Sequence, residues 1–519
     1  MKGDTLLKIN FEKIAAVAFL AVIFAGAGFN EYRNKGQLSK SLSGMTLNSA
    51  QKQFAAAAET FKTNFAGRSK LIDLYGISLN AMGKKVVGNF EFIKDKNGNM
   101  QNITIDYNYD TFFDSMTELK KSVGNADLFF VNIPSAAGHD AVPIDNWFSF
   151  QNPDRTEICG RLTNANISVL DLSDNFDASS YYFKTDVHPK TESEFKAAQY
   201  IYNRLADDGI DVQDGERIFD INNYTVSQRE FIGNLSRSSG RFYAGSDIFE
   251  YYIPNFETSY QLLVYNSGLF KTGTWEDVIL NHKFPQENIY NYYVTDYVQW
   301  PSPAYTIRND LTASNAKVLF IADSMALRTI SYLSLSVNEL TVADPRYSTN
   351  QEYIKCLLAN NSYDAVIVCA ASPAFINTPF SSYFSEADIS GYTTLPTQTS
   401  DEWIGSNGMW IEDQAEGNTI SLSKAKSYMD MLQISGWAAD FGSDTPLTDL
   451  IAEVNGKKYR CSYGFEKKGV ADKFGDGLLR TGFTLWIPDG ISAGDKITFT
   501  MVNSGTQAVY EPVTYEFTE

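Results

Sequence analysis

The heptapeptide VLFIADS, residues 318–324, anchors the expected fold of this chain. Its apolar run predicts a short buried strand that ends abruptly at Asp323-Ser324, and a helical pattern follows over residues 325–335. A serine between a buried strand and a helix lies near unpaired backbone N–H groups, which can hold an oxyanion. This is the setting of an acyl-transfer nucleophile. A Ser or Asp here is also a common helix N-cap, so the position alone leaves both interpretations open.

A second stretch, YFKTDVH at residues 182–188, supplies a carboxylate and an imidazole two residues apart. In an extended segment both side chains point to the same side, so Asp186 can orient His188 while His188 faces a serine. The chain has only 3 histidines, which leaves a serine enzyme few candidate bases. Together the two stretches predict Ser324 as nucleophile, His188 as general base and Asp186 as its orienting carboxylate.

Apolar runs alternate with helical patterns on both sides of these stretches. Strands are expected over residues 128–134, 167–172, 340–346 and 363–369, and helices over 111–123 and 191–205. Such alternation predicts an α/β fold with a mostly parallel sheet and flanking helices. Sites in these folds gather at the carboxyl ends of the strands, where both stretches are expected to lie.

Composition argues against several classes of partner. The 519 residues are 44% hydrophobic and carry a net charge of −19, which argues against nucleic acid. The charge also disfavours a strongly anionic polymer, unless Arg308, Arg328 and Arg346 form a local cluster. The 4 cysteines are too few for a disulfide scaffold. No zinc-type spacing occurs, so we expect no metal and no cofactor.

The N-terminal part predicts a membrane anchor. Residues 14–29 are apolar or small and follow basic residues, which places the rest of the chain outside the cytoplasm. We expect an uncleaved single-pass anchor within residues 1–35, in the cell membrane. Residues 25–27, Ala-Gly-Ala, would also serve as a signal-peptidase site, so a cleaved and secreted form is the alternative.

The segment before the serine strand is rich in aromatic and amide side chains. Residues 286–305 contain many Tyr and Asn, which either pack as a solvated loop or stack on sugar rings. Tyr305 and Asn309 continue this segment toward the serine strand, and we expect them to bind substrate. The whole catalytic domain is expected over residues 36–395.

The C-terminal region has a different pattern. Short β-like runs separated by glycine turns predict a β-sandwich over residues 410–519. Residues 436–440 and 480–483 resemble β-modules appended to bacterial glycan-modifying enzymes, which suggests a carbohydrate-binding role with Trp437 as one contact. The alternative is a module that only packs on the catalytic domain.

The motif residues also carry a family resemblance. YYFKTDVH at residues 181–188 resembles the signature of the alginate O-acetyltransferase family, the AlgJ/AlgX-like or DHHW proteins. IADS at 321–324 resembles their Gly-Asp-Ser nucleophile block, and the Asp-x-His precedes the serine as in that family. Weaker matches are residues 65–68, 90–98, 231–240, 247–254 and 340–346. The resemblance implies an SGNH-hydrolase-type domain.

This resemblance implies a function. The chain would be an extracytoplasmic O-acetyltransferase that modifies a secreted or cell-surface polysaccharide through an acetyl-Ser324 intermediate. A separate multi-span membrane acyltransferase would supply the acetyl donor, and Arg346 would be a substrate-side residue. Two alternatives stay open. One is a carbohydrate acetylesterase with the same triad, and the other is a non-catalytic glycan-binding assembly protein.

Three positions depart from the family pattern. Ala322 stands in place of a glycine, Pro189 in place of a tryptophan, and Glu194-Phe195 in place of Gly-Ala. The oxyanion asparagine of SGNH enzymes has no clear counterpart in residues 370–373.

Overall fold

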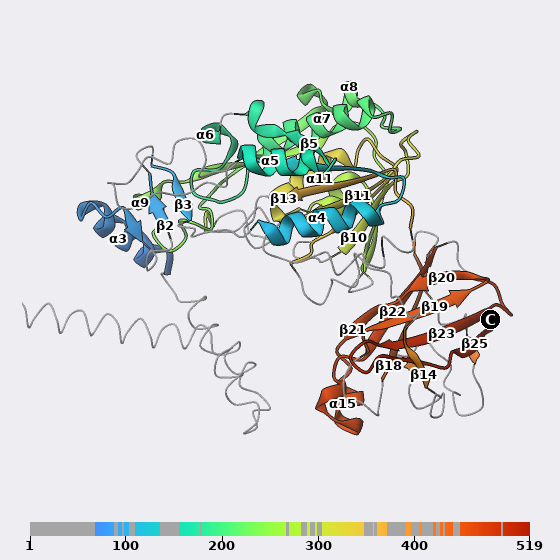
Figure 1. Ribbon diagram of the computed structural model, residues 1–519. Coiled ribbons are helices and arrows are strands. Elements are labelled where there is room, and N and C mark those ends of the chain that lie inside the picture. Colours follow the sequence, from blue (N-terminus) through green and yellow to red (C-terminus); the bar gives the residue numbers. More distant parts are fainter. Residues whose placement is uncertain are drawn as a thin grey trace, which may run out of the picture.

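The computed structural model describes residues 68–87, 92–95, 98–102, 109–134, 155–176, 178–265, 269–281, 288–290, 296–297, 304–346, 357, 361–370, 391–395, 404–406, 419–421, 426–428, 431–439, 447–488 and 491–518. They form an α/β part and a β-rich C-terminal part, each built on its own sheets (Figure 1).

The α/β part is built on one eight-stranded sheet with the order β5-β4-β13-β11-β12-β10-β8-β9. Its strands are β4 (Asp127–Asn132), β5 (Ser168–Asp171), β8 (Tyr260–Val264), β9 (Leu269–Gly273), β10 (Ala304–Asn309), β11 (Lys317–Ala322), β12 (Glu339–Ala343) and β13 (Ala365–Ala370). The strands from β5 to β12 in this order pair in parallel, and β10, β8 and β9 extend the sheet in antiparallel pairs. The predicted α/β fold is confirmed, and the antiparallel extension is an addition that the sequence did not indicate.

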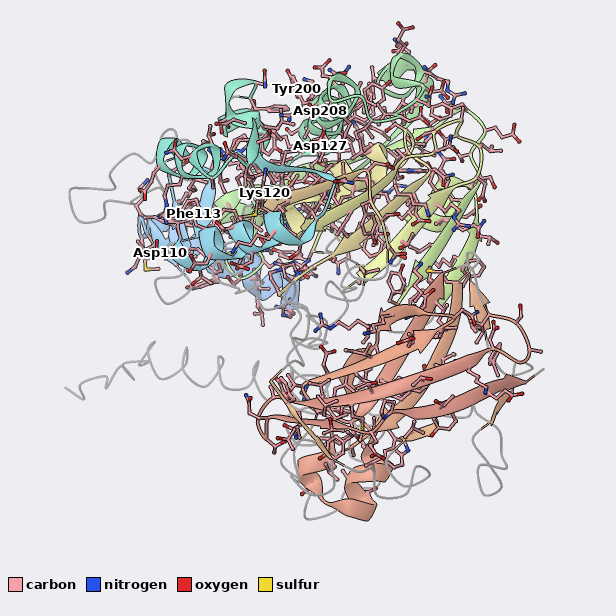
Figure 2. The ribbon with its side chains drawn as sticks, turned by 45° about the vertical axis from the view of Figure 1, so that its right-hand side comes forward. Asp110, Phe113, Lys120, Asp127, Tyr200 and Asp208 are labelled. Atoms are coloured by element: carbon pink, nitrogen blue, oxygen red, sulfur yellow. The ribbon has the colours of Figure 1, made fainter. Side chains whose placement is uncertain are left out.

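Helices cover both faces of this sheet, which explains why β11 is apolar from Val318 to Ala322. Val318 and Phe320 face the core shared with α7 (Thr191–Asp207) and α11 (Leu327–Leu333). Leu319 and Ile321 face the core shared with α4 (Asp110–Ser122) and α5 (Arg155–Asn164). Figure 2 shows α4 through Asp110, Phe113 and Lys120, and α7 through Tyr200 with Asp208 at its C-terminal end.

A smaller layer lies against the stretch that contains His188. It contains α3 (Arg68–Ala81), the strands β1 (Val86–Val87), β2 (Phe92–Lys94) and β3 (Met100–Asn102), the hairpin of β6 (Tyr224–Phe231) and β7 (Asp247–Pro254), and α9 (Arg241–Ala244). The Met100 N–H donates to the Lys184 carbonyl at 2.9 Å, so β3 touches the motif directly. Short helices complete the α/β part: α6 (Ala178–Tyr181), α8 (Gly215–Ile218) and α10 (Trp275–Ile279).

The C-terminal part consists of two sheets around one apolar core. One contains β14 (Thr393–Leu395), β16 (Thr419–Ser421), β19 (Asp449–Val454), β20 (Lys457–Arg460), β23 (Lys496–Asn503), β24 (Ala508–Tyr510) and β25 (Val513–Thr518). The other contains β15 (Ile404–Ser406), β17 (Lys426–Tyr428), β18 (Met431–Ala438), β21 (Ser462–Phe465) and β22 (Gly482–Pro488). The helix α15 (Lys468–Phe474) follows β21.

The predicted boundaries of this C-terminal part need correction. β14 pairs with β24 and β15 pairs with β18, so residues from Thr393 onward already belong to the C-terminal sheets. The catalytic domain predicted to reach residue 395 and the sandwich predicted from residue 410 therefore divide the chain too late. Strands of three residues are too short to show a period in the sequence.

The two parts meet through aromatic side chains. Alternation along β22 points Phe483 and Leu485 into the sandwich core and Trp486 out of it. The Trp486 ring meets Tyr265 edge to face, with 5.1 Å between the ring centroids.

Trp437, the expected carbohydrate contact, is not fully exposed. Its side chain is partly buried against the cluster of Ala439, Val470 and Leu478.

Among the described residues, no helix is both long and apolar enough to cross a membrane. The anchor predicted over residues 14–29 lies outside the described part of the chain.

Candidate active site

Ser324 lies at the carboxyl end of a central strand. β11 ends at Ala322, Asp323 is extended, and residues Ser324–Ala326 form one 3₁₀ turn that leads into α11. The Asp323 carboxylate accepts a hydrogen bond from the Met325 N–H at 2.9 Å, so Asp323 is the N-cap. Asp323, not Ser324, therefore caps the helix, and the Ser324 hydroxyl is available for another partner.

That partner is His188. Its Nε2 atom lies 3.0 Å from the Ser324 Oγ atom, although the two residues are 136 positions apart. Its Nδ1 atom lies 2.6 Å from Asp186 Oδ1. All three side chains are buried. The structure therefore brings together the three residues that the sequence nominated, in the order carboxylate, imidazole and hydroxyl.

The loop that holds Asp186 and His188 is bent, not extended as expected. Tyr182 and Pro189 form an isolated antiparallel bridge, and residues 184–188 turn between them. Asp186 Oδ1 accepts both the His188 N–H at 3.0 Å and the ring Nδ1. The two side chains meet because the Asp186 carboxylate binds both the backbone N–H and the ring of His188. Strand alternation plays no part.

The second oxygen of Asp186 is held from another element. Asp186 Oδ2 accepts the Asn234 N–H at 2.7 Å. Burial alone would raise the pKa of Asp186, but the charge of His188 and the hydrogen bonds from His188 and Asn234 outweigh it and lower the pKa below its ordinary value. Asp186 is therefore ionised, as the partner of an imidazole that takes up a proton must be.

Asp247 and Gly233 fix the same loop. Asp247, the first residue of β7, accepts hydrogen bonds from the Lys184 N–H, the Thr185 N–H and the Thr185 hydroxyl at 3.0, 2.7 and 2.6 Å. The Gly233 N–H donates to Thr185 Oγ1 at 2.8 Å. A Cβ atom at Gly233 would overlap Asp186 Cβ and the Thr185 carbonyl. Sequence reasoning singled out residues 231–240 and 247–254 only as weak family matches. It did not predict that Asp247, Asn234 and Gly233 contact the His188 loop.

The expected substrate residues lie at two different edges of the sheet. β10 is antiparallel to β12, so Tyr305 lies at the edge of Ser324, whereas Asn309 lies at the opposite edge. The Asn309 amide is buried there and donates to the Leu335 carbonyl at 3.1 Å. The structure therefore does not bring Asn309 to the site, and the Tyr305 side chain, although at the right edge, is buried.

The three arginines do not form the cluster that an anionic polymer would require. Arg308 pairs with Glu339 at 3.3 Å at the far end of β12, while Arg328 is fully buried. Arg346 follows β12, at the edge of the sheet where Ser324 lies, and binds Asp344 through two nitrogens. Of the three, Arg346 alone combines partial exposure with a place at this edge.

The three departures from the family pattern are accommodated locally. Ala322 is the last residue of β11 and has no left-handed backbone conformation that would require glycine. The Pro189 carbonyl accepts a hydrogen bond from Arg328 Nη2 at 2.7 Å. Glu194 forms an ion pair with the same Arg328, and neither side chain is exposed.

One backbone donor is available beside Ser324. The N–H groups of Met325 and Ala326 donate to Asp323, but the Ser324 N–H has no acceptor among the described residues. It can therefore donate to an oxyanion formed on a substrate carbonyl. Within the described part of the chain, no group of three or more His, Cys, Asp or Glu side chains is placed to hold a metal ion.

Comparisons with known proteins give structural relatives only. No protein-family model matches the chain, and no curated protein matches its sequence. Among solved structures, it is similar to Bacillus cereus PatB1, with 18% identity and a TM-score of 0.43 over 56% of this chain and 98% of that chain. It is also similar to a DHHW family protein from Eubacterium siraeum, with 14% identity and a TM-score of 0.39 over 57% of this chain and 92% of that chain. A third is the O-acetyltransferase domain of Pseudomonas putida AlgJ, with 10% identity and a TM-score of 0.31 over 55% of this chain and 91% of that chain. These structures include members of the family that the sequence motifs resemble.

Proposed function

We propose that this protein is an O-acetyltransferase that acts on a polysaccharide through an acetyl-Ser324 intermediate. One observation carries the proposal: the buried chain of contacts from Asp186 through His188 to Ser324 Oγ, at 2.6 and 3.0 Å. A serine hydroxyl is a poor nucleophile unless a base accepts its proton, and this geometry supplies the base and its orienting carboxylate. The motif resemblance supports acetyl as the transferred group.

The reaction has two halves. In the first, Ser324 Oγ attacks the carbonyl carbon of the acetyl donor while His188 Nε2 takes the hydroxyl proton, and that proton then goes to the leaving group. In the second, His188 Nε2 takes a proton from a sugar hydroxyl, whose oxygen attacks the acetyl carbon. The bond between that carbon and Ser324 Oγ then breaks, and His188 returns the proton to Ser324 Oγ. Asp186 stays ionised, accepts a hydrogen bond from the Nδ1–H group throughout and stabilises the imidazolium. The Ser324 N–H donates a hydrogen bond to the oxyanion.

The test uses the full chain, an activated acetyl ester and candidate oligosaccharides. We expect a fast release of leaving group, acetyl on the peptide that contains Ser324, and transfer of that acetyl to sugar. Transfer to water alone would identify an acetylesterase with the same triad. The Ser324→Ala variant should lose both the acetyl-enzyme and labelling by a sulfonyl fluoride. Ser78→Ala, in α3, is the matched control. Full labelling of the Ser324→Ala variant would exclude Ser324 as nucleophile.

We also propose that this chain is a single-pass membrane protein whose active site lies outside the cytoplasm. A multi-span membrane acyltransferase would supply its acetyl donor. The proposal rests on residues 14–29 and their basic flank. A reporter that is active only in the cytoplasm, fused after Glu519, should be silent in cells. A bright reporter would overturn this topology.

A further inference from the structure

Two residues outside the triad join the elements that carry the base and the nucleophile. Glu194 lies in the first turn of α7, six residues after His188. Arg328 lies in the first turn of α11, four residues after Ser324. Their side chains form an ion pair in which both partners are fully buried. The pair therefore connects the two segments that must stay aligned for proton transfer.

Each partner also binds the backbone of the other's segment. Glu194 Oε1 accepts the N–H groups of Arg328 and Thr329 at 3.0 and 3.4 Å. Arg328 Nη2 donates to the carbonyl of Pro189, the residue directly after His188, at 2.7 Å. The Thr329 hydroxyl donates to the Glu194 carbonyl at 3.3 Å. These contacts fix the distance between α11 and the loop that contains His188.

The surroundings of the pair are apolar. The guanidinium carbon of Arg328 lies 5.2 Å from the ring centroid of Phe249 and 5.9 Å from that of Tyr297. Moving two charges out of water into such surroundings carries a large desolvation cost, and an apolar pair of similar volume is often equally stable. A contribution to the stability of the fold therefore does not by itself explain why these two positions hold an ion pair.

We propose that Glu194 and Arg328 are positioning residues that set the distance between His188 Nε2 and Ser324 Oγ. The proposal rests on the proposed function, because it gives the pair a role in the same acyl-transfer step. Neither side chain contacts the reacting atoms. Their effect passes through the Pro189 carbonyl on one side and the first N–H groups of α11 on the other.

The test is the rate at which a sulfonyl fluoride modifies Ser324 in the full chain. The main variant combines Glu194→Leu with Arg328→Met, which removes both charges and leaves none unpaired. We expect the maximal rate of modification to fall by about tenfold or more, because a misplaced base slows the step, while the half-saturating probe concentration changes by less than about threefold. Melting should stay cooperative.

The matched control is another buried ion pair, Asp449 and Arg460 in the C-terminal sheets. The same apolar exchange there, Asp449→Leu with Arg460→Met, should leave the maximal rate unchanged. A folded Glu194/Arg328 double variant with the wild-type rate would overturn the positioning role.

A conservative variant keeps the test decisive if the double variant does not fold. Arg328→Lys keeps the charge but loses the fork that reaches Glu194 and the Pro189 carbonyl together. It should fold and show an intermediate rate, and a wild-type rate would overturn the proposal. If the wild-type chain itself resists the probe at Ser324, the proposed function fails, which is a different result from equal rates in wild type and variant.

Discussion

At the scale of single residues, the site depends on the contacts of the Asp186 carboxylate and on a glycine, Gly233, that lets a second loop approach it. Its two carboxylate oxygens are occupied by His188 and by the Asn234 N–H. The loop that supplies Asn234 can approach this closely only because residue 233 is glycine. The Asn234 N–H therefore helps to orient the carboxylate that holds the His188 imidazole.

Replacing Gly233 with alanine should damage the site and the fold together. The added Cβ overlaps the Thr185 backbone, which cannot move without displacing Asp186. We expect a loss of roughly 1–3 kcal/mol in the free energy of unfolding, as for other overpacked positions. Modification of Ser324 should also slow.

The control is Gly160→Ala, in α5, where a Cβ atom would meet no neighbour within 4 Å. Because alanine favours helix, this variant should gain up to about 1 kcal/mol. Chemical denaturation measures both changes. A Gly233→Ala protein as stable and reactive as wild type would contradict the close approach.

The lowered pKa of Asp186 predicts a pH dependence of stability. Because the unfolded chain binds the proton more readily than the folded one, the stabilisation is present above the ordinary pKa of 3.8 and is lost as the pH falls through the lower folded value. The free energy of unfolding should therefore drop with falling pH in this acid range. In Asp186→Asn the drop should be shallower, and an unchanged slope in that variant would refute the assignment.

At the scale of elements, the hairpin of β6 and β7 braces the His188 loop. β7 contributes Asp247, and the segment after β6 contributes Gly233 and Asn234. The helices α7 and α11 hold the same loop from the side of the main sheet through Glu194 and Arg328. A loop without regular structure thus gains a defined conformation from four elements.

Asp247→Asn tests this bracing at constant side-chain volume. The amide keeps one acceptor oxygen but turns an NH₂ group toward donors that Asp247 now satisfies. We expect Ser324 modification to slow by about tenfold or more, since the base is displaced. Glu230→Gln on the exposed side of the same hairpin should leave the rate unchanged. Equal rates in both variants would show that the hairpin does not position the loop.

At the scale of the whole molecule, the C-terminal sheets dock on the α/β part at a distance from the triad. Trp486 meets Tyr265, which directly follows β8, and β8 is the third strand from β11 in the sheet. The contact is apolar and supplies no group to Ser324. The C-terminal part can therefore affect the reaction through binding of a long substrate or through stability of the neighbouring domain.

A chain that ends at Ser390 separates these roles. Because a small probe needs only the triad, its reaction with Ser324 should stay within about twofold of the full chain, whereas polymer acetylation should fall with the lost binding energy. Exposure of Tyr265 should also reduce solubility. Unchanged polymer acetylation would refute substrate binding by the C-terminal sheets, and loss of cooperative melting would indicate a structural role.

The sequence by itself predicted Asp186, His188 and Ser324 as one site and predicted the alternation of strands and helices. Both are local properties: an apolar run that stops at Asp323-Ser324, and a carboxylate two residues before a histidine. Only the tertiary structure decided which residues surround them. Strand direction in a sheet depends on pairing between distant segments, and this places Asn309 at the edge opposite Ser324 although the sequence suggested a shared site. The support of residues 184–188 by Asp247 and Asn234, and the Glu194–Arg328 pair, likewise depend on contacts between segments more than forty positions apart, which no local pattern encodes.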